Sequence, residues 1–386
     1  MNVIDLFSGV GGFSTGFKNE GYDIVLANEI DPMIAESFKY NHKSTLMINA
    51  DIKEFALNTE QLINNNLKKI DSKFRQDEIK QKLSNIDIII GGPPCQGFSM
   101  AGSRIRKHKD FIEDPRNYLF KYYFRILQKF EPEYFVFENV QGLMNMNKGR
   151  ILEEILQIFS DDSSFKNGGY KLDCLLVDSS QLGIPQKRKR IIIIGSKSKK
   201  INLKEELEKY IDIEQIPKNV TVRDAISDLN YLEVGEGQFE SDYLYKAVTK
   251  YQFERRMNAQ KLFNHIAPRH DEKTLNRISN ILEGGKYKST DKSQVIKSVH
   301  SGAYGRMSWD KASYTITTRF DTPSAGRVIH PILHRALTPR EAARLQSFDD
   351  DFIFIGNKTS IGKQIGNAVP PLMANALAKI IKKHKG

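Results

Sequence analysis

Short apolar runs alternate with helix-prone segments through the first half of the chain, and this alternation constrains the fold more than any other feature. Strands that alternate with helices predict an α/β fold with a doubly wound, mixed and mostly parallel sheet. Residues 59–84 are polar, basic and helix-prone, and should form an excursion between the third and fourth strands. The predicted strands, in chain order, are NVIDLF, DIVLANEI, STLMINADI, NIDIIIGG, EYFVFENV, KLDCLLVDS and KRIIIIGS.

A different pattern begins after Gly195, where the regular alternation stops and aromatic and basic residues are interleaved. Periodic structure returns at LTPREAARLQSF, in which Thr338 can cap a helix and Glu341 can complete a capping box. We therefore predict a first domain over 1–198, a second, smaller domain over 199–354, and a return of 355–386 to the first domain.

The composition limits the class of protein. Of the 386 residues, 40% are hydrophobic and 27% are charged, which is enough to bury a sizeable core. No apolar run approaches the roughly 20 residues that cross a bilayer, and the N-terminus lacks the pattern of a secretory signal. Cys95 and Cys174 are too few for a disulfide framework and match no zinc motif. We therefore expect a cytoplasmic protein with no membrane partner and no metal site.

The net charge bears on the partner. The chain carries a formal charge of +11, from 58 basic and 47 acidic residues. Such a surplus favours a polyanionic partner, because each phosphate that Lys or Arg neutralises releases counterions. A genome rich in lysine codons would give a similar surplus to any surface, so charge alone leaves both explanations open.

Glycines and carboxylates gather at the ends of the first three predicted strands. Gly9, Gly11 and Gly12 lie in the turn before the first helix, where a ligand can approach the backbone, although their spacing is not that of dinucleotide binders. Glu29 ends the second strand, where a carboxylate can accept both hydroxyls of a ribose. Asp51 ends the third, placed to accept from an adenine amine. Alone, the glycines suit a tight turn about as well as a cofactor site, and either carboxylate suits a solvated strand end better. Together, the three features favour an adenosine-containing cofactor.

The fourth strand runs into GGPPCQGFS, which places Cys95 behind two prolines at the carboxyl end of a strand. Ligands of open α/β sheets bind at this edge, and the basic loop that follows would stabilise a thiolate. The fifth strand ends in Glu138-Asn139-Val140. Neighbouring strands lie about 4.8 Å apart, so the carboxyl group of Glu138 could reach the same substrate. A lone cysteine is usually a small buried hydrophobe, but this setting favours a nucleophile beside an acid.

Several motifs together resemble the ordered motifs of the DNA cytosine C5-methyltransferases of the bacterial restriction–modification type. They span residues 3–373 in the family's order; GGPPCQGFS and RALTPREAARLQSF are highly specific, whereas ENV alone is weak. The resemblance implies a Rossmann-like methyltransferase fold, S-adenosylmethionine as cofactor, catalysis in 1–198 and DNA target recognition in 199–354. The motifs are DLFSGVGGF, GGPPCQGFS, ENV, QKRKR, RALTPREAARLQSF and GKQIGNAVPP.

The resemblance also implies a mechanism and the residues that carry it. The Cys95 thiolate would add to C6 of a cytosine flipped out of duplex DNA, which makes C5 nucleophilic, and Glu138 would hold and protonate N3. Arg188 and Arg190 of QKRKR would contact the base oxygen and the neighbouring loop. The implied cofactor-binding residues are Phe7, Gly9, Val10, Gly12, Glu29, Ile30, Asp51, Ile52, Pro93, Asn367 and Val369.

One position departs from the family. Residue 30 is Ile, where many members carry an aromatic residue, so we expect weaker stacking on the adenine.

The run CQGFS favours DNA as the substrate, yet tRNA cytosine C5 methylation stays an alternative. A catalytically silent, cofactor- and DNA-binding protein is a second alternative, disfavoured because Cys95, Glu138 and Arg190 are all present. We expect a monomer that acts on double-stranded DNA, with a cognate restriction endonuclease encoded nearby as a candidate partner.

Overall fold

The computed structural model divides into two compact units, each of which is described separately. The described residues are 1–94, 118–287 and 302–385. Unit 1 comprises Met1–Asp178, Lys189–Gln215 and Ala374–Gly386. Unit 2 comprises Ser179–Arg188 and Ile216–Met373. These bounds fall at other positions than the predicted boundaries after residues 198 and 354, and the assignment of target recognition to 199–354 stays a prediction.

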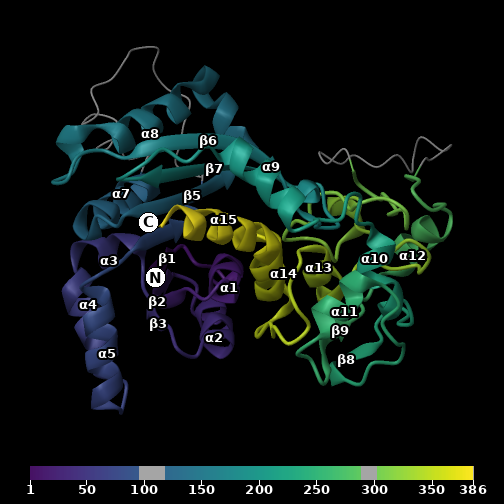
Figure 1. Ribbon diagram of the computed structural model, residues 1–386. Coiled ribbons are helices and arrows are strands. Elements are labelled where there is room, and N and C mark those ends of the chain that lie inside the picture. Colours follow the sequence, from purple (N-terminus) through teal and green to yellow (C-terminus); the bar gives the residue numbers. More distant parts are fainter. Residues whose placement is uncertain (95–117, 288–301, 386) are drawn as a thin grey trace. The chain divides into compact units, whose positions relative to one another are not determined.

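A seven-stranded sheet forms the centre of unit 1 (Figure 1). Its strands are β1 (Asn2–Leu6), β2 (Asp23–Glu29), β3 (Leu46–Asn49), β4 (Ile88–Gly91), β5 (Tyr134–Val140), β6 (Lys171–Asp178) and β7 (Lys189–Ser196). They lie in the order β3-β2-β1-β4-β5-β7-β6. The strands from β3 to β5 pair in parallel, whereas β7 runs antiparallel to β5 and to β6. This topology confirms the predicted mixed, mostly parallel sheet.

Both faces of this sheet are buried. The described α-helices of unit 1 are α1 (Gly12–Asn19), α2 (Pro32–Asn41), α3 (Ile52–Leu57), α4 (Thr59–Leu67), α5 (Lys73–Leu83), α7 (Tyr118–Phe130), α8 (Arg150–Ser160), α9 (Leu203–Ile213) and α15 (Pro371–His384), which enters the unit at Ala374. Ile89 of β4 and Phe135 of β5 share one core with α3, α7 and α8. Ile88 and Ile90, which alternate with Ile89, are equally buried on the opposite face. Burial on both faces explains the continuous apolar runs of these strands.

Residues 59–84 form the predicted helical excursion between β3 and β4. The excursion consists of helices α4 (Thr59–Leu67) and α5 (Lys73–Leu83). Leu67 and Ile79 anchor the two helices in the same core as the sheet. The outer side of the excursion is polar apart from Phe74, which is 81% exposed.

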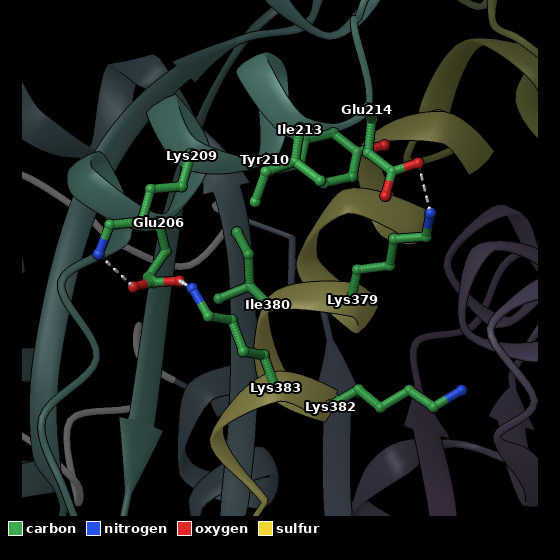
Figure 2. Close-up of a pocket in the computed structure, with 9 residues that line it drawn as sticks. All are labelled: Glu206, Lys209, Tyr210, Ile213, Glu214, Lys379, Ile380, Lys382 and Lys383. Atoms are coloured by element: carbon green, nitrogen blue, oxygen red, sulfur yellow. Dashed lines mark hydrogen bonds and ion pairs between the residues drawn. The ribbon is translucent and has the colours of Figure 1, made fainter.

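The last helix, α15, is tied to the rest of unit 1 by ion pairs. Figure 2 shows Lys383 of α15 paired with Glu206 of α9, and Lys379 paired with Glu214, each at 2.7 Å. These side chains line a cavity of about 310 Å³ between the two helices. The hydroxyl of Tyr22 also donates to the carbonyl oxygen of Ala378 at 2.8 Å. From Ala374 on, the C-terminal helix therefore packs as part of unit 1.

Unit 2 contains little regular secondary structure. Its described α-helices and strands are α10 (Val222–Ile226), β8 (Gly237–Ser241), α11 (Lys250–Arg256), β9 (Leu262–Ile266), α12 (Glu272–Ser279), α13 (Pro339–Leu345) and α14 (Lys358–Asn367). Strands β8 and β9 form an antiparallel pair. Thr338 and Glu341 form the predicted capping box at the start of α13. Within the described ranges of both units, no helix is long and apolar enough to cross a membrane.

Buried arginines hold the irregular backbone of unit 2. Carbonyl groups outside helices and sheets still need donors when they are buried, and a guanidinium offers five N–H groups. Arg335 donates to both oxygens of Glu341 at 2.8 Å. Arg306 is only 2% exposed and donates at 2.7–2.9 Å to the carbonyl oxygens of Ile278, Ile281, His330 and Leu333.

Candidate active site

The turn after β1 has a backbone that leaves room for a ligand. Phe7 has a φ of 56°, Gly9 of 54° and Gly11 of 96°. Left-handed backbone is uncommon outside glycine and costs about 1–3 kcal/mol, so Phe7 marks a constrained position. Among the described residues, a Cβ built on Gly9 would meet no atom within 4 Å, whereas one on Gly11 would lie 2.4 Å from Nε2 of His42. No described atom therefore fills the space beside Gly9, and α1 begins shortly after it, at Gly12.

Glu29 ends β2 beside this turn and is held by backbone groups. Its Oε2 accepts from the N–H of Gly9 at 3.0 Å, and its Oε1 accepts from the N–H of Asp31 at 2.8 Å. Burial raises the pKa of this carboxyl, although both N–H groups act in the opposite direction. Each carboxylate oxygen can accept a further hydrogen bond. Glu29 thus fits the predicted contact with ribose hydroxyls, and Ile30, which is 62% exposed, fits an apolar cover for an adenine.

Of three other predicted cofactor residues, one, Asp51, differs from its expected setting. Asp51 does not end β3, which stops at Asn49; it is the N-cap of α3, and its Oδ1 accepts from the N–H of Lys53 at 2.7 Å. The expected strand end was wrong because aspartate is also a favoured N-cap residue. Val10 and Ile52 are buried, at 1% and 4% exposed.

A second carboxylate, Glu138 of β5, forms an ion pair with Arg190 of β7. Oε1 of Glu138 lies 2.9 Å from Nε of Arg190, and only 12% and 13% of the two side chains are exposed. The antiparallel pairing places Val140 opposite Arg190. Glu138, two residues earlier, therefore lies on the same face of the sheet as a diagonal neighbour of the arginine.

The glycine–proline turn after β4 packs against this ion pair. A Cβ built on Gly92 would lie 2.7 Å from Oε2 of Glu138, so only a glycine fits without displacing the carboxylate. Asn139 donates from Nδ2 to the carbonyl oxygen of Pro93 at 2.9 Å, which fixes the turn to the end of β5. Cys95 lies outside the described residues, two positions beyond Pro93. The described part of the turn thus ends beside the Glu138–Arg190 pair.

Arg188 has a different setting from Arg190. It lies just before β7, which begins at Lys189. Its side chain is buried in unit 2 and donates at 3.1–3.2 Å to the carbonyl oxygens of Ile316, Gly366 and Ala368. These bonds fix the turn that carries two predicted cofactor residues, the exposed Asn367 and the buried Val369.

Sequence reasoning did not single out Gly92 or Asn139, although both lie inside recognised motifs. A glycine at the end of a buried strand can signal close approach of another group, so Gly92 carried a usable signal. Nothing in the sequence predicts the bond from Asn139 to Pro93 or the left-handed φ of Phe7. Among residues 1–94, 118–287 and 302–385, no group of His, Cys, Asp or Glu side chains could hold a metal ion.

The family described as C-5 cytosine-specific DNA methylase matches residues 1–383. Among curated relatives, the Type II methyltransferase M.DdeI of Desulfomicrobium norvegicum is 34% identical over 398 residues, which cover 99% of this chain and 88% of the relative. The Type II methyltransferase M1.HphI of Haemophilus parahaemolyticus is 33% identical over 386 residues, covering 99% and 87%.

Solved structures agree with this family match. One described as a candidate DNA modification methyltransferase, encoded within a prophage of E. coli, has a TM-score of 0.71 and 26% identity over 99% of both chains. Dnmt2 of S. pombe has a TM-score of 0.59 over 100% of both chains, and at 16% identity it supports the fold alone. The chain therefore belongs to the family of C-5 cytosine-specific DNA methylases.

Proposed function

We propose that this DNA methyltransferase transfers the methyl group of S-adenosylmethionine to C5 of a cytosine flipped out of duplex DNA, through a covalent bond between Cys95 and C6 of the base. The observation that carries the proposal is the buried Glu138–Arg190 pair, with the Gly92–Pro93 turn packed against it. The acid and the approach to the thiol lie at the carboxyl ends of β5 and β4, where ligands of such sheets bind. The cation joins them from the amino end of β7, which runs antiparallel to β5.

Each residue of the pair has a defined task in this mechanism. C5 of cytosine is too weak a nucleophile to take a methyl group unaided. The Cys95 thiolate adds to C6 and forms a carbon–sulfur bond, while Glu138 donates a proton to N3 and C5 gains electron density. Arg190 holds Glu138 and the base oxygen. Once C5 carries the methyl group, loss of the C5 proton expels the thiolate, and the N3 proton returns to Glu138.

The glycine turn and Glu29 are the proposed cofactor site. S-adenosylmethionine, when bound, supplies the electrophilic methyl group. Glu29 would accept from the ribose hydroxyls through the lone pairs that its two backbone partners leave available. Ile30 would cover the adenine. The other proposed contacts, in part through the backbone, are Phe7, Gly9, Val10, Gly12, Asp51, Ile52, Pro93, Asn367 and Val369.

Arg188 enters this proposal through the turn that it holds. Its three bonds to backbone carbonyls fix the segment of Asn367 and Val369. We therefore propose that Arg188 positions the proposed cofactor contacts of that turn, and that Arg190 is the arginine that meets the base.

The DNA sequence should be read by residues 199–354. The target base cannot be reached inside a duplex, so the enzyme flips it at a cost of a few kcal/mol, and basic and aromatic side chains of the second region would contact the major groove. Grafting the corresponding segment of a related enzyme should move the methylated sequence with it. A folded, active chimera with unaltered specificity would contradict this assignment.

A cognate restriction endonuclease is the proposed biological partner. The relatives M.DdeI and M1.HphI are Type II methyltransferases, and methylation by this enzyme would protect cellular DNA from an endonuclease of the same specificity. We propose a monomer that acts in the cytoplasm. Plasmid DNA from cells that express the protein should resist that endonuclease, whereas DNA from cells that express Glu138→Gln should be cut.

The direct test of the function is methyl transfer from labelled S-adenosylmethionine to duplex DNA and, separately, to tRNA. We expect label in duplex DNA, and bisulfite sequencing should locate it at one cytosine of a fixed sequence. Label in tRNA alone would support the tRNA alternative. Binding of cofactor and DNA without any transfer would support a silent binding protein.

A further inference from the structure

Tyr314 lies on a segment that is fixed to the approach to β7. Ser313 pairs with Gln186 in a parallel bridge, its N–H donates to the carbonyl of Pro185 at 2.9 Å, and its carbonyl accepts from Lys187 at 2.8 Å. On the other side of Tyr314, the hydroxyl of Thr315 donates to the carbonyl of Lys187 at 2.8 Å. The backbone on both sides of Tyr314 is therefore fixed to the segment that leads, three residues after Lys187, to Arg190.

The side chain of Tyr314 is exposed and has a cationic neighbour. Tyr314 is 59% exposed. This exposure is high for a tyrosine, because aromatic side chains usually bury a large apolar surface. The guanidinium of Arg327 lies over the ring, 5.2 Å from its centroid. That guanidinium is itself fixed, since its Nη1 donates at 2.8–3.0 Å to the carbonyl oxygens of Gly284, Gly285 and Arg306. The result is an exposed aromatic surface with little freedom to move.

The charges around this ring suit a nucleic acid. Two cations lie near it: Lys187, which is exposed on the adjacent segment, and Arg327, which lies over the ring. Both provide positive charge for a phosphate backbone. Proteins that handle unstacked nucleic acid place aromatic rings beside such charge, because every base has a π-face that can stack on them. A ring that is already immobilised loses little entropy when a base stacks on it.

We propose that Tyr314 is a stacking platform for a nucleobase of the substrate DNA. Flipping leaves the neighbouring bases and the orphaned partner base with an open face, and the fixed ring supplies a replacement surface. The inference rests on the proposed function, since it assumes a base that leaves the duplex. It assigns to Tyr314 a contact with the base rather than with the phosphate.

Substitutions that separate the ring from its hydroxyl test this assignment. Tyr314→Phe keeps the stacking surface and should bind a duplex with the methylated sequence as the wild type does. Tyr314→Leu removes the aromatic face and should weaken binding about 5- to 150-fold, as expected for about 1–3 kcal/mol per stacked base. Tyr40→Leu is the matched control, because Tyr40, on helix α2, is 48% exposed and has Lys43 over its ring. The affinity of this variant for DNA should not change.

The emission of a fluorescent base in the DNA distinguishes stacking on Tyr314 from a purely structural role of this residue, which would leave the emission unchanged. 2-Aminopurine is placed in turn at each position beside the target cytosine and opposite it. At one position the wild type and Tyr314→Phe should show quenched emission that becomes bright in Tyr314→Leu. Equal affinity and emission in all variants would overturn the inference, as would equal losses in Tyr314→Phe and Tyr314→Leu, which would indicate a hydroxyl–phosphate bond. Failure of the wild type to methylate DNA would instead refute the proposed function.

Discussion

Two glutamates at the edge of the same sheet are held in different ways. Glu29 accepts hydrogen bonds from the backbone N–H groups of Gly9 and Asp31. Glu138 instead pairs with the side chain of Arg190, and its carboxylate occupies space that a side chain at position 92 would need. Side-chain substitutions around Glu29 leave backbone donors in place, proline excepted. The proposed cofactor half should therefore tolerate changes among its neighbours, while the proposed base half should fail when a single neighbour changes.

The largest effect should come from Glu138→Gln, which keeps the shape of the side chain but removes the acid. Methyl transfer should fall by about 10²- to 10⁴-fold, the usual contribution of a general acid. Cofactor affinity should stay the same, because Glu29 is held independently. Glu153→Gln, an exposed glutamate on α8, is the control. If transfer continued at the wild-type rate in Glu138→Gln, the role of Glu138 would be refuted.

Gly92→Ala tests the packing against the same carboxylate. The new Cβ would lie 2.7 Å from Oε2 of Glu138, so the carboxylate has to move. A misplacement of about 1 Å can cost roughly 100-fold in rate, so we expect kcat to fall by about 10- to 100-fold. Gly142→Ala is the control, since its Cβ would be 3.8 Å from Cγ2 of Val140, an ordinary contact. An unchanged kcat in Gly92→Ala would show that Glu138 does not need this position.

The same two regions show how far sequence reasoning reaches. The strands that carry Glu29 and Glu138 are largely apolar runs, and their type and parallel direction follow from alternation with helices. The side chains beyond the strand ends are harder to predict, because Asp51 could end a strand or cap a helix, and only the backbone decides. Arg188 was harder still, since neither its spacing nor its charge indicates that it binds carbonyl groups of residues 316, 366 and 368.

Unit 2 resists prediction for a related reason. Its irregular segments are held by buried arginines such as Arg306, which binds carbonyls far away in the sequence. Such pairings follow no period of 2 or 3.6 residues. The capping box of Thr338 and Glu341 was predictable because it depends on residues that are close in sequence.

Glu29→Ala should affect binding of the cofactor, whereas the two substitutions in the base half should affect the rate of methyl transfer. The loss of hydrogen bonds to a charged group should weaken binding of S-adenosylmethionine by roughly 1–3 kcal/mol. Isothermal titration calorimetry measures this directly, with Glu36→Ala, an exposed glutamate on α2, as control. Unchanged affinity would remove Glu29 from the cofactor site.

The smallest expected effect is a pH dependence of cofactor binding. Burial raises the pKa of Glu29, so this carboxyl takes up a proton at a higher pH than an exposed glutamate does. The neutral carboxyl accepts hydrogen bonds more weakly, and the Kd for S-adenosylmethionine should therefore rise as the pH falls through that raised pKa. The dependence should vanish in Glu29→Gln, which has no proton to gain. A Kd that rose equally at low pH in Glu29→Gln would assign the titration to another group.

The central claim is a covalent bond between Cys95 and the target base, and a duplex with 5-fluorocytosine at the target position tests it. Methyl transfer should proceed, but no C5 proton remains to be removed, so an adduct stable to denaturant should accumulate when S-adenosylmethionine is present. Burial raises the pKa of Cys174, in β6, to about 11, so its thiol should be inert. Cys174→Ala should keep the adduct, and Cys95→Ala should lose it while still binding cofactor. An adduct that persisted in Cys95→Ala, or disappeared only in Cys174→Ala, would contradict the account.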